Sequence, residues 1–196
     1  FRYDLVDTTR QALQVISITY YKNLIVSYQS KNLPQVKEAA DNLLTLINSM
    51  DLVLLTNEYF LLGRWLNAAK RVIHGTRGIH PIDYKRLLEF NARNQITTWG
   101  PHENIEDYAN KMWSGLLKDF YKPRWQTFVD GLTNSLTQGK PFNQSAYNEK
   151  ILLLEMVWYS GNTTYPEHPQ ADTYTTVLAV HEKYRKQDDV LRSKNF

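Results

Sequence analysis

The sequence predicts an all-α protein, a single irregular bundle of about eight helices that forms one domain over residues 1–196. Three observations favour this fold class. Apolar residues recur at steps of three and four along most of the chain, as they do on the buried face of a helix. The chain has only eight glycines and seven prolines, so few breakers interrupt its elements. No segment alternates apolar and polar residues for long enough to predict a strand.

Breakers divide the first half of the chain into four predicted helices. A polar break at 30–33 precedes Pro34, which suits the first turn of a helix. Gly75, Gly78 and Pro81 mark a second interruption. The predicted helices cover residues 4–29, 34–55, 58–73 and 83–99.

Four further helices are predicted in the second half. Pro123 begins one of them and Gly139 stops it, and either Asn143 or Ser145 caps the next. The longest loop covers 162–171, and the charged residues 186–194 are expected to fray at the chain end. These helices are predicted at residues 105–121, 123–138, 143–160 and 173–185.

The bulk composition excludes several classes of protein. There is no cysteine, so disulfides and thiol chemistry are absent. The net charge of +3 is too small to indicate nucleic-acid binding without a basic patch. No apolar run reaches the roughly 18 residues that a membrane span needs. The chain begins with Phe1 rather than methionine, which suggests a processed chain or a fragment.

The most informative stretch is the corner between Asn91 and Tyr108. Gly100-Pro101 ends one predicted helix, and Asn104 suits the N-cap of the next. This arrangement brings Trp99, Ile105 and Tyr108 to one edge of the helical body. Two interpretations remain open: the aromatic side chains form a wall of a ligand site, or they plug the end of a helix pair.

Motifs for metal and nucleotide chemistry are missing from the sequence. The five histidines show no spacing typical of a metal site, and no phosphate-binding loop or nucleophile elbow occurs. Carboxylates do cluster at Glu103, Glu106 and Asp107, and glycosidases use paired carboxylates. However, acidic residues in the first turn of a helix are common for electrostatic reasons, so we assign no catalytic residue and no cofactor.

The sequence also contains a basic stretch at residues 64–93 and two glycosylation sequons. The basic residues suggest either an anion-binding patch or a solvated face. They are Arg64, Lys70, Arg71, Arg77, Lys85, Arg86 and Arg93. The sequons at Asn143 and Asn162 matter only in a glycosylating secretory pathway.

Several strings of residues resemble the C-terminal helical domain of the α-N-acetylglucosaminidases, glycoside hydrolase family 89. The order and approximate spacing of these strings hold from residue 1 to the 140s. They are F-R-Y-D-L-V-D-T-T-R-Q-A at 1–12, F-L-L-G-R-W-L at 60–66, N-A-R-N-Q-I-T-T-W-G-P at 91–101, N-I-E-D-Y-A-N-K at 104–111, Y-K-P-R-W at 121–125 and G-K-P-F at 139–142.

The resemblance implies a role for this domain in a larger enzyme. In that family a barrel-type catalytic domain carries the two catalytic carboxylates, and the helical domain closes one side of the substrate pocket. The implied pocket residues are Trp99, Ile105 and Tyr108. The residues implied to support that wall are Asn91, Arg93, Gln95 and Asn104. The implied partners are the barrel of the same polypeptide and a glycan with a terminal α-linked N-acetylglucosamine, with no nucleic acid or membrane.

Two functional hypotheses follow from these patterns. The first is a domain of an exo-acting, retaining α-N-acetylglucosaminidase that is inactive on its own. The second is a free-standing helical module that binds a glycan or an acidic partner through Trp99, Tyr108 and the basic stretch. The expected location is secreted or periplasmic for a bacterial relative, and lysosomal for the animal relatives of the family.

Overall fold

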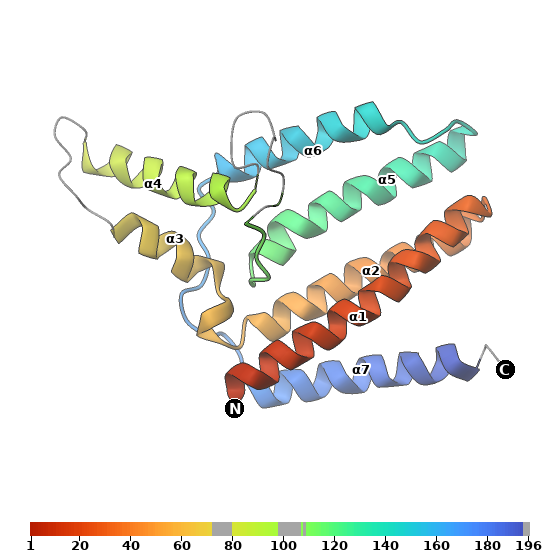
Figure 1. Cartoon of the computed structure of the whole chain (residues 1–196), viewed down its shortest axis with the longest axis horizontal. Helices are drawn as coiled ribbons and strands as arrows, with labels where there is room; N and C mark the ends of the chain where they lie inside the picture. The colour runs from red at the N-terminus through yellow and green to blue at the C-terminus, as the bar shows by residue number, and fades with distance from the viewer. Residues whose placement is uncertain (72–79, 98–106, 108, 194–196) are drawn as a thin grey trace.

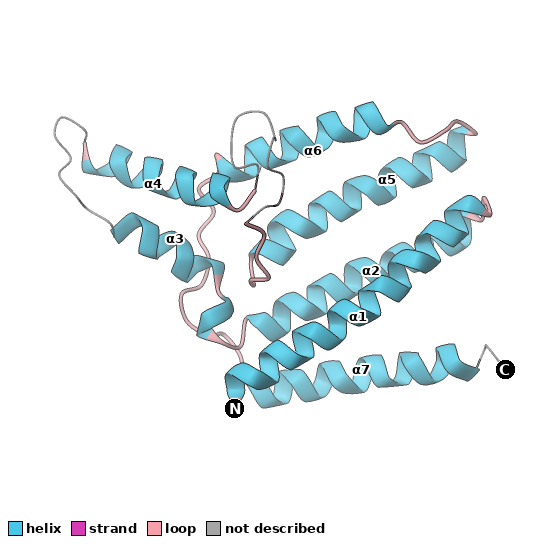
Figure 2. Ribbon diagram, in the orientation of Figure 1, coloured by secondary structure: helices cyan, strands magenta, loops and turns pink. Residues whose placement is uncertain are grey.

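The computed structural model describes residues 1–71, 80–97, 107 and 109–193, and of 186–193 it describes the backbone alone. Within these residues the chain forms seven α-helices and no β-strand (Figures 1 and 2). A 3₁₀ turn (Glu58–Phe60) precedes the third helix, and a π-helical turn (Leu117–Tyr121) leads into the fifth. The α-helices are α1 (Arg2–Gln29), α2 (Leu33–Leu54), α3 (Leu62–Arg71), α4 (Pro81–Gln95), α5 (Lys122–Gln138), α6 (Gln144–Tyr159) and α7 (Thr173–Ser193).

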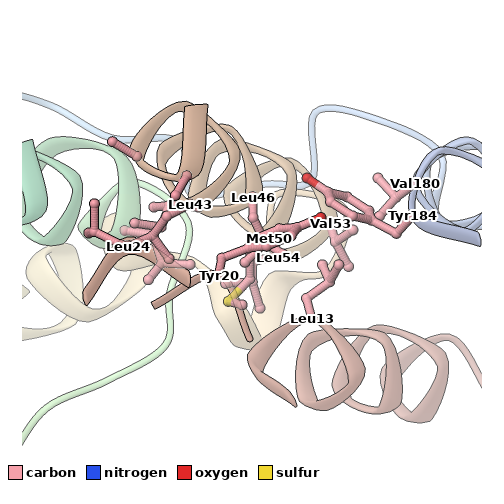
Figure 3. Close-up of a cluster of buried hydrophobic side chains, with 14 of the residues drawn as sticks. Leu13, Tyr20, Leu24, Leu43, Leu46, Met50, Val53, Leu54, Val180 and Tyr184 are labelled. Carbon is pink, nitrogen blue, oxygen red and sulfur yellow. The ribbon is translucent and has the colours of Figure 1, made fainter. Parts of the chain in front are cut away.

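The main core lies between α1, α2, α5 and α7, whose long axes run side by side in Figure 1. Each of these helices contributes leucine, valine or tyrosine side chains that are almost completely buried, and Figure 3 labels those of α1, α2 and α7. Tyrosine hydroxyls at its edges find polar partners: Tyr28 pairs with Ser135 at 2.7 Å, and Tyr184 donates to Ser49 at 2.9 Å. The core is therefore closed at its edges by specific hydrogen bonds between helices.

A second, smaller core joins α3, α4 and α6 to the π-helical turn. It contains Leu62, Leu66, Ile96, Phe120 and Trp158, each at most 8% exposed. In Figure 1 the α3–α4 pair projects from one end of the main body, and the end of α4 meets the end of α6. This second core fixes the end of α4, which is where the predicted site begins.

The helical class is confirmed, but the predicted helix at 105–121 is wrong over its described first part. Residue 107 and residues 109–115 are not helical, and the helix that reaches α5 begins only at Leu116. Ser114 instead pairs with another segment, because its N–H donates to the Phe60 carbonyl and its carbonyl accepts from Leu62. The predicted fifth and sixth helices are thus one continuous helical segment, which explains why seven helices replace the eight expected.

Asp51, in the last turn of α2, determines where that segment begins. Its carboxylate accepts hydrogen bonds from the Gly115 N–H at 2.7 Å, the Lys118 N–H at 3.2 Å and the Ser114 hydroxyl at 3.2 Å. These donors include N–H groups at a helix start that have no partner within the helix. Burial raises the pKa of Asp51, although the three hydrogen bonds act in the opposite direction. An N-cap from a distant helix is invisible to a reading of local sequence.

Other predicted boundaries shift by a few residues. The third helix does not start at Glu58, because an extended residue, Leu61, separates the 3₁₀ turn from α3. The fourth ends at Gln95 rather than at Trp99. The last predicted helix ended at residue 185, whereas the described backbone of α7 continues to Ser193; the expected fraying of 186–194 stays a prediction. The predicted caps at Asn143 and Gly139 are confirmed.

Candidate functional site

The described residues contain only part of the predicted site. Trp99, Asn104, Ile105 and Tyr108 lie outside the described residues, as do Gly100 and Pro101. Asn91, Arg93 and Gln95 are described, and all three lie on α4. The described part of the site therefore consists of these α4 residues and of the two positions that flank residues 98–106.

Thr97 and Asp107, the residues on either side of 98–106, are joined by a hydrogen bond. The Asp107 N–H donates to the Thr97 carbonyl at 3.3 Å. Thr97 is itself almost fully buried, and its hydroxyl donates to the Arg93 carbonyl at 2.9 Å. The two residues that flank 98–106 are therefore joined to each other, and Thr97 anchors them to the end of α4.

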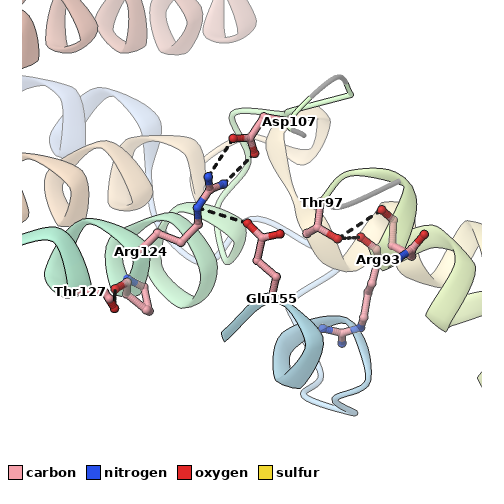
Figure 4. A network of polar contacts seen from close by, with 8 residues as sticks. Arg93, Thr97, Asp107, Arg124, Thr127 and Glu155 are labelled. Carbon is pink, nitrogen blue, oxygen red and sulfur yellow. Dashed lines mark hydrogen bonds and ion pairs between the residues drawn. The ribbon is translucent and has the colours of Figure 1, made fainter. Parts of the chain in front are cut away.

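The side chain of Asp107 is held by an arginine from α5 (Figure 4). Arg124 donates two hydrogen bonds to the Asp107 carboxylate, at 2.7 and 2.9 Å, and its Nε lies 3.4 Å from the Glu155 carboxylate on α6. Burial alone would lower the pKa of Arg124, but the hydrogen bonds and charge of Asp107 raise it overall. The prediction that Asp107 lies in the first turn of a helix is wrong, since its φ is +53° and its carboxylate pairs with Arg124.

Arg93 makes a comparable connection from α4. Its side chain is 1% exposed, and it donates to Glu89 at 2.7 and 3.0 Å and to the Thr163 carbonyl at 2.6 Å. The guanidinium also lies 5.0 Å from the ring centroid of Trp158 and 5.5 Å from that of Tyr165. These contacts join α4 to α6 and to the loop that follows it. Arg93 thus occupies a supporting position next to the Thr97 anchor.

Asn91 and Gln95 lie apart from this buried network. Both side chains are exposed, and together with Asn94 and Trp65 they line a groove of about 660 Å³ between α3 and α4. The three described residues that were predicted to act together are therefore divided between two places. Arg93 is directed into the core beside Trp158, whereas Asn91 and Gln95 are presented to the groove.

The basic stretch at 64–93 is largely neutralised among its described residues. Arg64 pairs with Glu58 at 2.7 Å, Lys70 with Glu89 at 3.1 Å and Arg71 with Glu167 at 3.3 Å. With Arg93 buried against Glu89 as well, four of the seven cations have acidic partners, while Arg77 lies outside the described residues. These pairs favour the solvated-face interpretation over an anion-binding patch.

The described residues offer no cluster that suits metal or carboxylate chemistry. Among the parts of the chain that the structure describes, no group of three histidine or acidic side chains is arranged to hold a metal ion. His80 accepts a hydrogen bond from the Ile82 N–H at the start of α4. Glu103 and Glu106 lie outside the described residues, and Asp107 is occupied by Arg124. Within the same described parts, no helix has both the length and the apolar character of a membrane span.

Comparison with known proteins identifies the family. The model of the α-N-acetylglucosaminidase C-terminal domain matches residues 1–183. The chain belongs to this family. Human α-N-acetylglucosaminidase is 37% identical over 185 residues, which are 94% of this chain and 24% of the human protein. The chain thus spans about a quarter of that relative.

Solved structures of a family 89 glycoside hydrolase from Clostridium perfringens share the fold. The complex with 2-acetamido-1,2-dideoxynojirmycin superposes with a TM-score of 0.81 at 28% identity, over 94% of this chain and 21% of the relative. The complex of a double glutamate-to-glutamine variant with GlcNAc-α-1,4-galactose gives a TM-score of 0.80 at 28% identity, over 93% and 21%. The resemblance predicted from the sequence strings is confirmed.

Within this α-N-acetylglucosaminidase C-terminal domain, the sequence did not single out the residues that anchor the ends of 98–106. Thr97, Arg124 and Glu155 appeared in no predicted site, although Arg124 stands within one of the strings that carried the resemblance. Arg124 and Glu155 are 31 positions apart in sequence and meet only because α5 and α6 pack together. The one local signal in the sequence is an arginine in the first turn of a predicted helix, next to Trp125 and three residues after Tyr121.

Proposed function

We propose that this domain works within a longer α-N-acetylglucosaminidase, where it supplies one wall of the pocket for the terminal sugar. Trp99, Ile105 and Tyr108 form that wall. An aromatic ring packs against the C–H face of a sugar, while neighbouring polar groups bond its hydroxyls. The Clostridium relative was solved with GlcNAc-α-1,4-galactose, and we extend this substrate class, a terminal α-linked N-acetylglucosamine, to the parent enzyme.

The observation that carries this proposal is the anchoring of both ends of residues 98–106. The Thr97–Asp107 hydrogen bond and the Asp107–Arg124 ion pair fix the points between which Trp99 and Ile105 must lie. A binding residue is effective when its surroundings hold it in a productive position, and this hydrogen bond and ion pair hold the two flanking residues in place. Arg124 holds Asp107 directly, whereas the Arg93 carbonyl accepts from Thr97 and the Arg93 side chain ties α4 to α6 (Figure 4).

The chemistry itself belongs to another part of the polypeptide in this proposal. A retaining glycosidase uses two carboxylates about 5–5.5 Å apart, one as acid and base and the other as nucleophile. Asp107 is unsuited to either role, because its carboxylate is bound by Arg124. We therefore propose that a barrel-type catalytic domain of the same polypeptide supplies both carboxylates and that no cofactor takes part.

An exposed apolar stripe on α6 supports the presence of such a partner domain. Leu153, Met156 and Val157 are 62%, 44% and 66% exposed, and their spacing places them on one face of the helix. Contiguous apolar side chains on a surface commonly mark an interaction site. We propose that this stripe packs against the remainder of the parent polypeptide, and that the domain reaches the catalytic centre from that side.

The test compares two variants of the full-length parent enzyme with a core control. Trp99→Ala and Tyr108→Phe are expected to lower kcat/KM by roughly 5- to 150-fold with little change in the thermal midpoint, because they remove contacts to the sugar and its transition state. Leu116→Ala, which truncates a fully buried side chain, should instead destabilise the protein by about 2–5 kcal/mol. If Trp99→Ala melts as early as Leu116→Ala and retains normal kinetics, the corner is a structural plug.

A further inference from the structure

The groove between α3 and α4 has the composition of a carbohydrate site. Trp65 contributes an indole ring from α3, and Asn91, Asn94 and Gln95 contribute three amides from α4. Each amide carries both a donor and an acceptor, which matches sugar hydroxyls that also donate and accept. The small side chains of Ala68 and its neighbour Ala69 keep the α3 side of the groove open. The lining is therefore aromatic and amide-rich.

We propose that this groove binds the sugars that follow the terminal N-acetylglucosamine, on the leaving-group side of the bond that is cleaved. This inference rests on the proposed function, because it assigns the next part of the same substrate. The ligand class is a neutral, hydroxyl-rich oligosaccharide. Asn91 and Gln95 hold its hydroxyls, and Trp65 offers an apolar surface to a sugar ring.

The position of the groove supports this assignment. Asn91 and Gln95 are one helical turn apart on the same face of α4, so their amides follow one another along the groove. Gln95 stands two residues before Thr97, the last described residue before 98–106. In the proposed arrangement, a glycan whose terminal sugar meets the wall extends its next sugars along this face of α4.

The electrostatics of the groove favour a neutral ligand over an anion. None of its lining residues is charged. The nearest lysine on α3, Lys70, is paired with Glu89 at 3.1 Å, so its charge is compensated. Trp65 is held in place by Trp113, with ring centroids 5.5 Å apart, and its indole N–H points to the Ala92 carbonyl at 3.5 Å. A pre-positioned ring loses little freedom when a sugar binds to it.

The experiment uses the full-length parent enzyme and two substrates that share the terminal sugar. One is an aryl α-N-acetylglucosaminide, whose leaving group has no hydroxyls for the amides, and the other is a neutral trisaccharide that ends in α-linked N-acetylglucosamine. The double variant Asn91→Ala/Gln95→Ala should lower kcat/KM for the trisaccharide by about 10-fold, as expected for two lost neutral hydrogen bonds, and change the aryl substrate by less than about 2-fold. Ala68→Phe, which fills the groove, should act in the same direction.

Asn23→Ala, the same change at an exposed asparagine on α1, is the matched control and should affect neither substrate. Equal losses for both substrates would overturn the inference, because the amides would then support the terminal-sugar site. No loss for either substrate would also overturn it, since the groove would then not touch the glycan.

Failure of the proposed function has a different signature. If the corner is a structural plug, Trp99→Ala keeps normal kinetics on both substrates; if the parent enzyme has another activity, the wild type hydrolyses neither substrate. Calorimetric titration with the trisaccharide then tests separately whether the groove binds a glycan. Binding by the wild-type enzyme that weakens about 10-fold in the double variant supports the groove assignment. Absence of binding, or equal binding by both proteins, rejects it.

Discussion

Replacing Arg124 by methionine should destabilise the domain by about 3 kcal/mol, the lower part of the range for removing one partner of a buried ion pair. This magnitude follows from the exposed fractions of the two acidic side chains that Arg124 contacts. The side chain of Glu155 is 6% exposed, so removal of the Arg124 guanidinium takes away a cation that faces a buried carboxylate. Asp107 is 37% exposed, and water compensates for most of its lost pairing. For a domain of this size the thermal midpoint should fall by about 6–12 °C.

Urea denaturation of the purified domain measures this change, and a double variant tests its cause. Arg124→Met combined with Glu155→Met replaces both buried partners by apolar side chains of similar length. Such replacements are often close to neutral, so the double variant should be more stable than Arg124→Met alone by at least about 1 kcal/mol. A double variant no more stable than the single one would refute the reasoning, as would a cost below about 1 kcal/mol for Arg124→Met.

Three other predictions concern activity, pH and backbone geometry. The purified chain should not hydrolyse an aryl α-N-acetylglucosaminide, and turnover at the rate of the full-length enzyme would overturn the domain assignment. Burial by itself raises the pKa of Glu89, but hydrogen bonds from Arg93 and a neighbouring lysine lower it overall. The ionised Glu89 carboxylate therefore stabilises the folded state fully above the ordinary glutamate pKa, and this contribution is lost as the pH falls through the lowered pKa of the folded state. The difference in unfolding free energy between wild type and Glu89→Gln should accordingly shrink from about pH 5 to pH 3 in urea titrations. Gly115→Ala should lower the free energy of unfolding by about 1–3 kcal/mol because of the backbone φ of +88° alone. The loss should be larger than that, because a Cβ at this position would lie 2.6 Å from the Tyr165 ring. Gly139→Ala, with a φ of +62° and nothing within 4 Å, isolates the backbone contribution, and equal losses for the two variants would exclude a clash.

The sequence predicts most of the helices because their limits are set locally. Pro34 and the turn before it, the Asn143 cap and Gly139 each act through their own neighbours, and each is found where the pattern indicates. The helix predicted at 105–121 failed for a nonlocal reason. Its apolar spacing is helical, but hydrogen bonds from Ser114 to the segment around Leu61 hold that part of the chain out of a helix.

The candidate site was predictable only in part. The resemblance assigned Arg93 a supporting role, and this role stays a prediction; its observed partners Trp158 and Thr163 come from a region of weak resemblance. The local sequence around Arg124 and Glu155 does not predict that they pair, because an ion pair between two helices depends on how those helices pack. Asn91 and Gln95 were expected to support the wall, whereas the structure presents them to a separate groove.

The cap that Asp51 provides has a consequence for the order in which the chain folds. The helical segment from Leu116 into α5 has its first N–H groups satisfied by a carboxylate more than sixty positions earlier in the sequence. Helix nucleation is costly, and closing so long a loop adds an entropic cost, so this segment gains its start only after α2 is in place. The α1–α2 hairpin, whose contacts are local, is then the template on which the second half of the domain assembles. A peptide covering residues 107–160 alone should begin its helix later than Leu116, at Pro123, where a local signal exists.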